Sequence, residues 1–151
     1  KFLKIKNQYV LIILGKGEEK KNLIKLIKKK NLSNSVYLLG NVNNVYDFMR
    51  SSDVFVLSSL WEELGFVIAE AALNNLFIIS SDCPNGPKEF LNHGKNGIIY
   101  NTNKENSLLN ALVNFSELKN PEEKIINAKK NCSKYTKFKH HKNLIKILLN
   151  E

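Results

Sequence analysis

The most informative stretch of this chain is Ser58-Ser59-Leu60-Trp61-Glu62-Glu63-Leu64-Gly65-Phe66-Val67-Ile68-Ala69-Glu70-Ala71-Ala72. Two carboxylates, Glu62 and Glu70, lie eight residues apart, and Gly65 lies between them. An apolar segment at 54–57 precedes the stretch and predicts a strand, and an alanine-rich segment follows and predicts a helix. In open α/β sheets, ligands bind at such turns between a strand and a helix. The stretch therefore predicts both an α/β fold and a ligand site.

The residue types in this stretch indicate the ligand's chemistry. Ionised carboxylates only accept hydrogen bonds and suit hydroxyl groups, so Glu62 and Glu70 are candidates to bind a sugar or a ribose. Open amides at a helix start suit phosphate, and the candidates follow Gly65, which lets the backbone approach a ligand closely. These amides belong to Leu64, Phe66 and Val67. Hydroxyl groups together with phosphate describe a nucleotide sugar.

Each carboxylate also has a purely structural interpretation. Glu70 could occupy an exposed position on an amphipathic helix. Glu62 and Glu63 could complement the dipole at a helix start, and Glu63 could take the role of Glu62 if the loop shifts.

Apolar runs that alternate with helical patterns predict parallel βαβ units, and hence a Rossmann-like parallel sheet with helices on both faces. The run at 9–14 is continuous and typical of a strand buried on both faces. We expect Gly15, Gly40, Glu62 and Gly65 to gather at the carboxyl ends of the strands of one sheet. Strands are predicted at 9–14, 36–39, 54–57, 77–80 and 97–100. Helices are predicted at 18–30, 45–51, 65–74, 88–92, 104–115, 121–134 and 138–149.

The central stretch resembles the E-x7-E signature of family 4 glycosyltransferases, in the carboxyl-terminal half of the GT-B fold. The family pattern reads roughly E-G-F-G-x-x-x-x-E-A, and Glu63 departs from it by replacing the first glycine. The resemblance covers about residues 8–100, because further landmarks follow in family order. These are Gly15-Lys16-Gly17, Leu39-Gly40-Asn41-Val42, the segment 52–58, the segment 79–89 and the segment 92–97.

The resemblance implies a retaining enzyme that transfers a hexose or N-acetylhexosamine from a nucleoside diphosphate sugar, with UDP favoured, and that needs no cofactor or metal. The acceptor would be a glycan or a lipid-linked molecule in bacterial polysaccharide or glycoconjugate biosynthesis. Glu62 would contact the donor sugar as the catalytic-site carboxylate, and Glu70 would accept bonds from the ribose. The other donor-binding candidates are Gly15, Lys16, Gly17, Gly40, Asn41, Val42, Leu64, Gly65, Phe66 and Val67, with Asn41 and Val42 at the base.

Family members also carry an earlier strand and helix, and before these an acceptor domain. We therefore interpret residues 1–151 as a single donor-binding domain that is a fragment of a longer enzyme. Because catalysis requires both reactants to be positioned together, we expect the isolated fragment to be inactive in transfer.

The net charge of +9 is unevenly distributed. Residues 1–30 hold ten Lys and two Glu, whereas residues 51–100 hold six acidic residues and two Lys. Basic faces can meet nucleic acid or an anionic membrane, which keeps a basic membrane- or nucleic-acid-binding domain open as an alternative function. Arg50 is the only arginine, and this counts against nucleic acid. A non-catalytic nucleotide-binding module on the same fold is the other alternative.

Cys83 and Cys132 lie far apart in the chain and predict two reduced, unpaired thiols in a cytoplasmic protein. No run of eighteen apolar residues suggests a membrane span, and the lysines at the start lead into a strand rather than a signal-peptide cleavage site. We expect a cytoplasmic protein that can contact the inner face of the cell membrane peripherally.

Overall fold

The computed structural model describes residues 1–63 and 65–149, and it divides the chain into two compact units, Lys1–Phe48 and Met49–Glu151. Each unit is described by itself below. The interpretation of residues 1–151 as one donor-binding domain stays a prediction.

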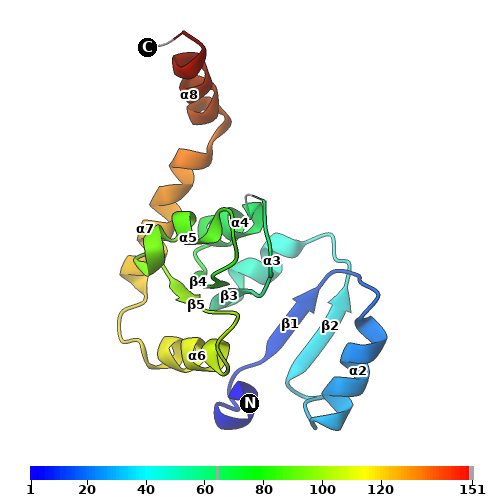
Figure 1. Cartoon of the computed structure of the whole chain (residues 1–151). Coiled ribbons are helices and arrows are strands. Elements are labelled where there is room, and N and C mark those ends of the chain that lie inside the picture. Colours follow the sequence, from blue (N-terminus) through cyan, green and yellow to red (C-terminus); the bar gives the residue numbers. More distant parts are fainter. Residues whose placement is uncertain (64, 150–151) are drawn as a thin grey trace. The chain divides into compact units, whose positions relative to one another are not determined.

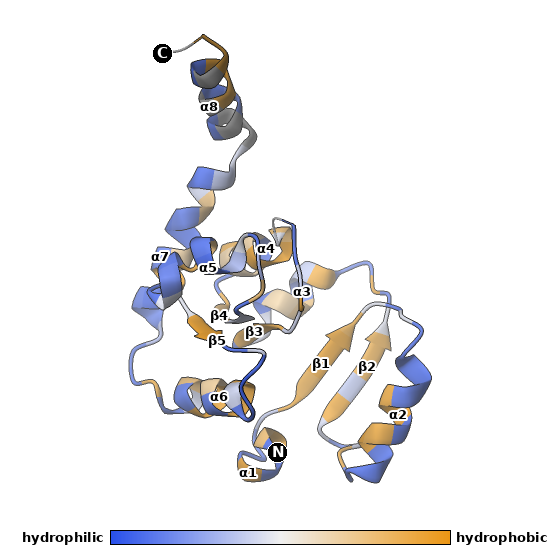
Figure 2. Cartoon of the chain, in the orientation of Figure 1, coloured by the Kyte–Doolittle hydropathy of each residue, from blue (hydrophilic) through white to orange (hydrophobic). Residues whose placement is uncertain are grey.

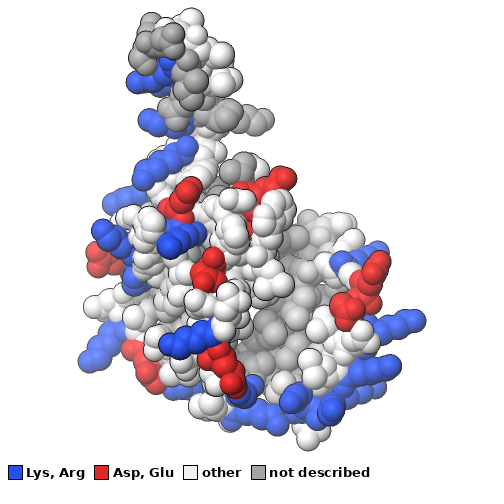
Figure 3. All heavy atoms as spheres, in the orientation of Figure 1, with Lys and Arg blue, Asp and Glu red and all other residues white. Residues whose placement is uncertain are grey.

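The first unit is a two-stranded parallel sheet with one long helix (Figure 1). After the short helix α1 (Phe2–Ile5), strand β1 (Leu11–Leu14) pairs with β2 (Val36–Gly40), and α2 (Lys20–Lys29) connects them. The lysines of α2 make its outer face strongly hydrophilic (Figure 2) and gather as a positive surface over the helix (Figure 3). This pattern is that of an amphipathic helix covering a sheet.

Strand β1 is less buried than its sequence predicts. Leu11 and Ile12 are 41% and 38% exposed, so the prediction of a strand buried on both faces is wrong for β1. Among the described residues, β1 is paired by hydrogen bonds with β2 only. Its apolar composition therefore does not ensure its burial.

The second unit contains a three-stranded parallel sheet in the order β3 (Val54–Leu57), β4 (Phe77–Ser81), β5 (Ile98–Tyr100). Strand β4 is central, and all five of its residues are buried. Phe77 and Ile79 pack in a core with Tyr100 and Ala111, whereas Ile78 lies on the opposite face because side chains alternate along a strand. Helices α4 (Phe66–Leu73), α5 (Pro87–Phe90) and α6 (Ser107–Glu117) surround this sheet (Figure 1).

The remaining elements complete this part of the chain. They are α3 (Val45–Arg50), η1 (Asn92–Gly94), α7 (Glu122–Asn131), η2 (Cys132–Tyr135) and α8 (Lys137–Leu149). Cys83 and Cys132 are free thiols, as the sequence predicts, and both are buried. Within the described residues, no helix is both long and apolar enough to cross a bilayer.

The predicted fold class is confirmed, since parallel strands alternate with helices throughout. Among the described residues, hydrogen bonds join two strands in the first unit and three in the second, and the expectation of one continuous sheet stays a prediction. Hydrophobic runs show where strands occur, but the pairing of strand edges depends on contacts that the runs do not encode.

Candidate functional site

The site in the second unit begins at Gly65, the residue before α4. Gly65 has φ 57° and ψ 43°, a left-handed conformation that glycine adopts without a steric penalty. A Cβ atom here would meet Ile68 Cδ1 at 3.5 Å, an ordinary contact, so it is the conformation rather than the space that requires glycine. Gly65 thereby turns the chain directly into the helix.

The first amides of α4 are available to a ligand. The Ile68 amide donates to Gly65 O at 2.8 Å, but the preceding amides of Phe66 and Val67 have no acceptor among the described residues. Such amides lie at the positive end of the helix dipole and favour an anion. These two donors therefore lie at a helix start, where the sequence predicts them. Leu64, the third predicted amide, lies outside the described residues.

Glu62 is held by a chain of two hydrogen bonds. Ser59 Oγ donates to Glu62 Oε1 at 2.6 Å, and Ser81 Oγ donates to the carbonyl oxygen of Ser59 at 2.7 Å. Because Ser81 is the last residue of β4, these bonds fix the Glu62 loop at the carboxyl end of the sheet. Glu63 is exposed whereas Glu62 is half-buried, so the geometry favours Glu62 over Glu63 as the site carboxylate.

A cavity of about 380 Å³ opens beside this loop, and its lining residues are Trp61, Glu62, Glu63, Gly65 and Phe66. Phe66 is 63% exposed and Trp61 is 60% exposed. The Phe66 side chain therefore does not pack in the core. It points out of the core because the buried face of α4 begins with Ile68. Exposed aromatic rings next to a carboxylate offer both stacking and hydrogen bonding.

Glu70 shares a face of α4 with Phe66, which lines the cavity. The buried positions of this helix are Ile68, Ala71 and Ala72, whereas Glu70 is half-buried and follows Phe66 by four residues. Residues four apart in a helix share a face, so Glu70 and the exposed Phe66 lie one above the other. The alternative of a fully solvated surface position does not describe Glu70.

The other predicted donor-binding residues lie in the first unit. Gly15 directly follows β1 and Gly40 ends β2, both with positive φ (110° and 73°), and the Gly15 amide donates to Gly40 O at 2.7 Å. The two glycines therefore meet at the carboxyl ends of their strands. Lys16, Gly17 and Asn41 are exposed beside them, and Val42 is half-buried.

Sequence reasoning missed the side chains that support the site. Ser59 and Ser81 position Glu62, yet neither serine stands in a pattern that predicts this role. The available signal in the sequence was the pair Ser58-Ser59 after a strand. Ser59 and Ser81 lie 22 residues apart, however, and they meet only because β3 pairs with β4.

Asp82 joins the ends of β4 and β5 near this edge. Its Oδ1 accepts hydrogen bonds from the Thr102 amide at 2.9 Å and from Thr102 Oγ1 at 3.1 Å. The bond from the Thr102 amide is the main reason why the pKa of Asp82 is lowered, and the nearby Lys88 contributes to the same shift. The ionised carboxylate is thus the form that stabilises the folded chain.

This lowered pKa predicts a pH-dependent stability. The pKa of Asp82 is lower in the folded chain than in the unfolded chain, where it is about 3.9. The ionised carboxylate therefore contributes its full stabilisation of the fold above the unfolded-state pKa, and this stabilisation is lost as pH falls through the folded-state pKa. Asp82→Asn keeps an acceptor oxygen for Thr102 but does not titrate. We expect its urea midpoint to fall less than that of the wild type between about pH 5 and pH 3. Asp53→Asn, at an exposed aspartate, is the control, and equal pH dependence of Asp82→Asn and wild type would contradict the assignment.

Known proteins resemble this chain in sequence and in fold. The model of the family "Glycosyl transferases group 1" matches residues 1–132. An N-acetylgalactosamine-N,N'-diacetylbacillosaminyl-diphospho-undecaprenol 4-alpha-N-acetylgalactosaminyltransferase of Campylobacter jejuni is 29% identical over 98% of this chain and 41% of its own length. A UDP-Gal:alpha-D-GlcNAc-diphosphoundecaprenol alpha-1,3-galactosyltransferase of Escherichia coli is 34% identical over 82% of this chain and 31% of its own length.

Among solved structures, Anabaena HepE in complex with UDP superposes with a TM-score of 0.80 at 22% identity, over 95% of this chain and 42% of that chain. This likeness shows the fold. The chain spans between 20% and 41% of the length of the first curated relatives it matches. The family match over most of the chain, on a fold with parallel strands and an acidic helix-start site, shows that the chain belongs to the glycosyl transferases group 1 family, the family 4 enzymes of GT-B fold that its sequence resembles.

Proposed function

We propose that this chain is the donor-binding part of a retaining glycosyltransferase. It would bind a nucleoside diphosphate sugar, with UDP as the nucleotide, for transfer of a hexose or N-acetylhexosamine. The acceptor would be a glycan or a lipid-linked sugar in bacterial polysaccharide or glycoconjugate biosynthesis. Two relatives support this reading, since their names specify transfer of galactose or N-acetylgalactosamine to diphosphoundecaprenol-linked sugars.

The observation that carries the proposal is the juxtaposition of the anchored Glu62 with the open start of α4. A donor sugar has hydroxyl groups for Glu62 to accept from, and its diphosphate has oxygens for the Phe66 and Val67 amides. Fixed donors aimed at a leaving diphosphate stabilise the charge that develops as the glycosidic bond breaks. The exposed Trp61 and Phe66 rings would cover the bound sugar.

The roles of the individual residues follow from their positions. Glu62 would orient the donor sugar, and Glu70, one turn into α4, would accept hydrogen bonds from the ribose. In the first unit, Gly15, Lys16 and Gly17 would line the donor site with Gly40. Asn41 and Val42 would meet the base.

We further propose that donor binding needs no metal and that the protein works in the cytoplasm. In this scheme, helix amides supply the electrostatic stabilisation that a divalent ion gives in other transferases.

Calorimetric titration tests the proposal. We expect UDP and UDP-N-acetylglucosamine to bind saturably to the wild-type chain, and we expect EDTA or added Mg²⁺ to leave the affinity unchanged. CMP, which lacks the diphosphate, is the control and should bind more weakly. Failure of every nucleoside diphosphate to bind would contradict the donor-site proposal. Binding of UDP in the presence of Mg²⁺ only would contradict the metal independence.

A further inference from the structure

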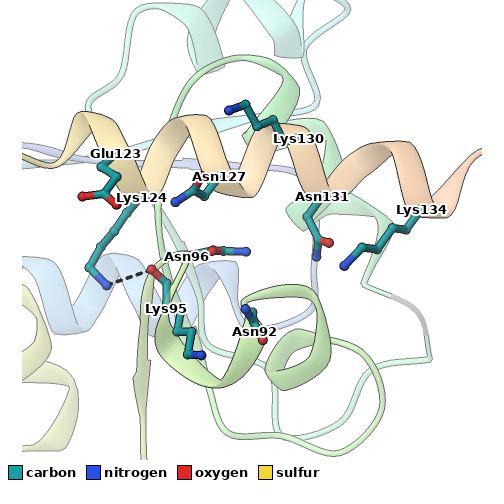
Figure 4. Close-up of a pocket in the computed structure, with 9 residues that line it drawn as sticks. All are labelled: Asn92, Lys95, Asn96, Glu123, Lys124, Asn127, Lys130, Asn131 and Lys134. Carbon is teal, nitrogen blue, oxygen red and sulfur yellow. Dashed lines mark hydrogen bonds between the residues drawn. The ribbon is translucent and has the colours of Figure 1, made fainter.

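A second cavity in the Met49–Glu151 unit has a chemistry unlike that of the site at α4. It has a volume of about 640 Å³ and lies between η1 on one side and α7 with η2 on the other (Figure 4). Its lining residues are Asn92, Lys95, Asn96, Glu123, Lys124, Asn127, Lys130, Asn131 and Lys134. The lining contains no aromatic side chain, so it offers no surface on which a base or a sugar could stack.

Positive charge dominates this cavity. Lys95, Lys124 and Lys134 carry ammonium groups around it, while Glu123 is the one acid among its lining residues. Figure 4 shows Lys130 directed to the other side of α7, away from the remaining lining side chains. The electrostatic balance of the cavity therefore favours an anion.

Lys124 is held in place and keeps donor capacity. Its Nζ donates to the carbonyl oxygens of Gly94 and Lys95, each at 3.0 Å. A lysine ammonium group has three N–H donors, so one remains after these two bonds. Because neither acceptor is a carboxylate, the positive charge of Lys124 is not neutralised by these contacts.

Asn96 is a buried amide that faces the cavity. The residue is only 8% exposed, and its backbone amide donates to Leu91 O at 3.0 Å, yet no hydrogen bond of its side-chain amide to another residue in the described part of the chain is found. In that same part, every fully buried side-chain nitrogen or oxygen has a hydrogen-bond partner. The polar end of Asn96 must therefore reach the cavity surface. Buried polar groups usually have a partner, so this amide is available to a ligand.

We propose that this cavity is a binding site for a phosphate group, separate from the donor site at α4. The ionised oxygens of a phosphate group accept hydrogen bonds, which matches the donors of Asn96, Lys124 and the exposed Lys95 and Lys134. Lysine binds phosphate as a point charge and does not need the planar geometry of arginine, which this chain uses once. The group could be carried by a free phosphate compound or by an anionic lipid headgroup.

Titration with inorganic phosphate, followed by ¹⁵N NMR, tests the site. We expect saturable shifts of the Asn96 side-chain amide in the wild-type chain, while the Phe66 and Val67 amides report separately on the donor site. Lys134→Glu replaces a positive charge that attracts phosphate with a negative charge that repels it, at an exposed position. It should therefore weaken phosphate binding roughly two- to thirtyfold. Lys28→Glu on α2 makes the same change of net charge elsewhere and should have almost no effect.

A second variant and a second probe sharpen the outcome. In Asn96→Leu the new side chain has a volume similar to that of asparagine, and thermal unfolding will show whether the variant folds. We expect it to weaken phosphate binding about two- to tenfold.

Sedimentation with phosphatidylglycerol vesicles then separates the two sources of the phosphate group. Sensitivity of vesicle binding to Lys134→Glu indicates a lipid headgroup, and phosphate binding alone indicates a free compound. If phosphate leaves the Asn96 amide unshifted, or Lys28→Glu weakens binding as much as Lys134→Glu, the proposal is wrong.

Discussion

Glu70→Gln is expected to weaken UDP binding roughly ten- to a hundredfold. The variant replaces a charged acceptor with a neutral amide, one end of which donates instead of accepting. Hydrogen bonds to charged groups contribute about 1.5–3 kcal/mol, and each 1.4 kcal/mol changes affinity about tenfold. Calorimetric titration of UDP into both proteins measures the effect. The prediction rests on the position of Glu70, which is half-buried and lies one turn beyond the cavity-lining Phe66 on the same face of α4.

Glu63→Gln is the matched control for this experiment. It makes the same chemical change. Glu63 also lines the cavity, but its side chain is exposed and accepts no described hydrogen bond from the loop, whereas Glu62 is anchored by Ser59. We expect Glu63→Gln to bind UDP nearly as well as the wild type. Both glutamines are nearly isosteric with glutamate and have similar helix propensity, so thermal unfolding should be unchanged. Equal affinities of wild type and a folded Glu70→Gln would remove Glu70 from the donor site.

Phe77→Ala is expected to lower the free energy of unfolding by about 3–5 kcal/mol. Phe77 is 1% exposed in the central strand β4, and its ring lies 4.9 Å from that of Phe115 in α6. Removal of the ring loses buried apolar area and leaves a cavity that the closely packed surroundings fill only in part. Urea unfolding followed by circular dichroism measures the change.

Phe66→Ala makes the same truncation at a position that is 63% exposed, in the same unit of the chain. Little apolar area is buried there, so we expect a change of less than about 0.5 kcal/mol in stability. The same variant should weaken binding of a nucleotide sugar if the ring covers the sugar. A destabilisation of Phe66→Ala as large as that of Phe77→Ala would mean that Phe66 packs in the core and does not line an open site.

From β1 onward, the sequence was sufficient to predict the order of strands and helices and the local form of the site, but it did not predict the short helix α1. Local patterns carry this information, because an apolar run ended by a glycine, as at Leu11–Leu14 before Gly15, restricts backbone conformation without reference to distant residues. The sequence also predicted that open amides and carboxylates would share one strand–turn–helix segment, since Glu62, Phe66 and Glu70 are close in the chain.

Only the tertiary structure decided which residues support these groups and which strands pair. Ser81 orients the Glu62 loop through Ser59, and Asn96 meets α7 across a cavity, because the pairing of β3 with β4 and β4 with β5 joins segments far apart in sequence. The exposure of Phe66 and of β1 is likewise decided by the neighbours that each element has, not by its own composition. Burial and hydrogen bonding are properties of pairs of segments, and a hydrophobic pattern describes each segment by itself.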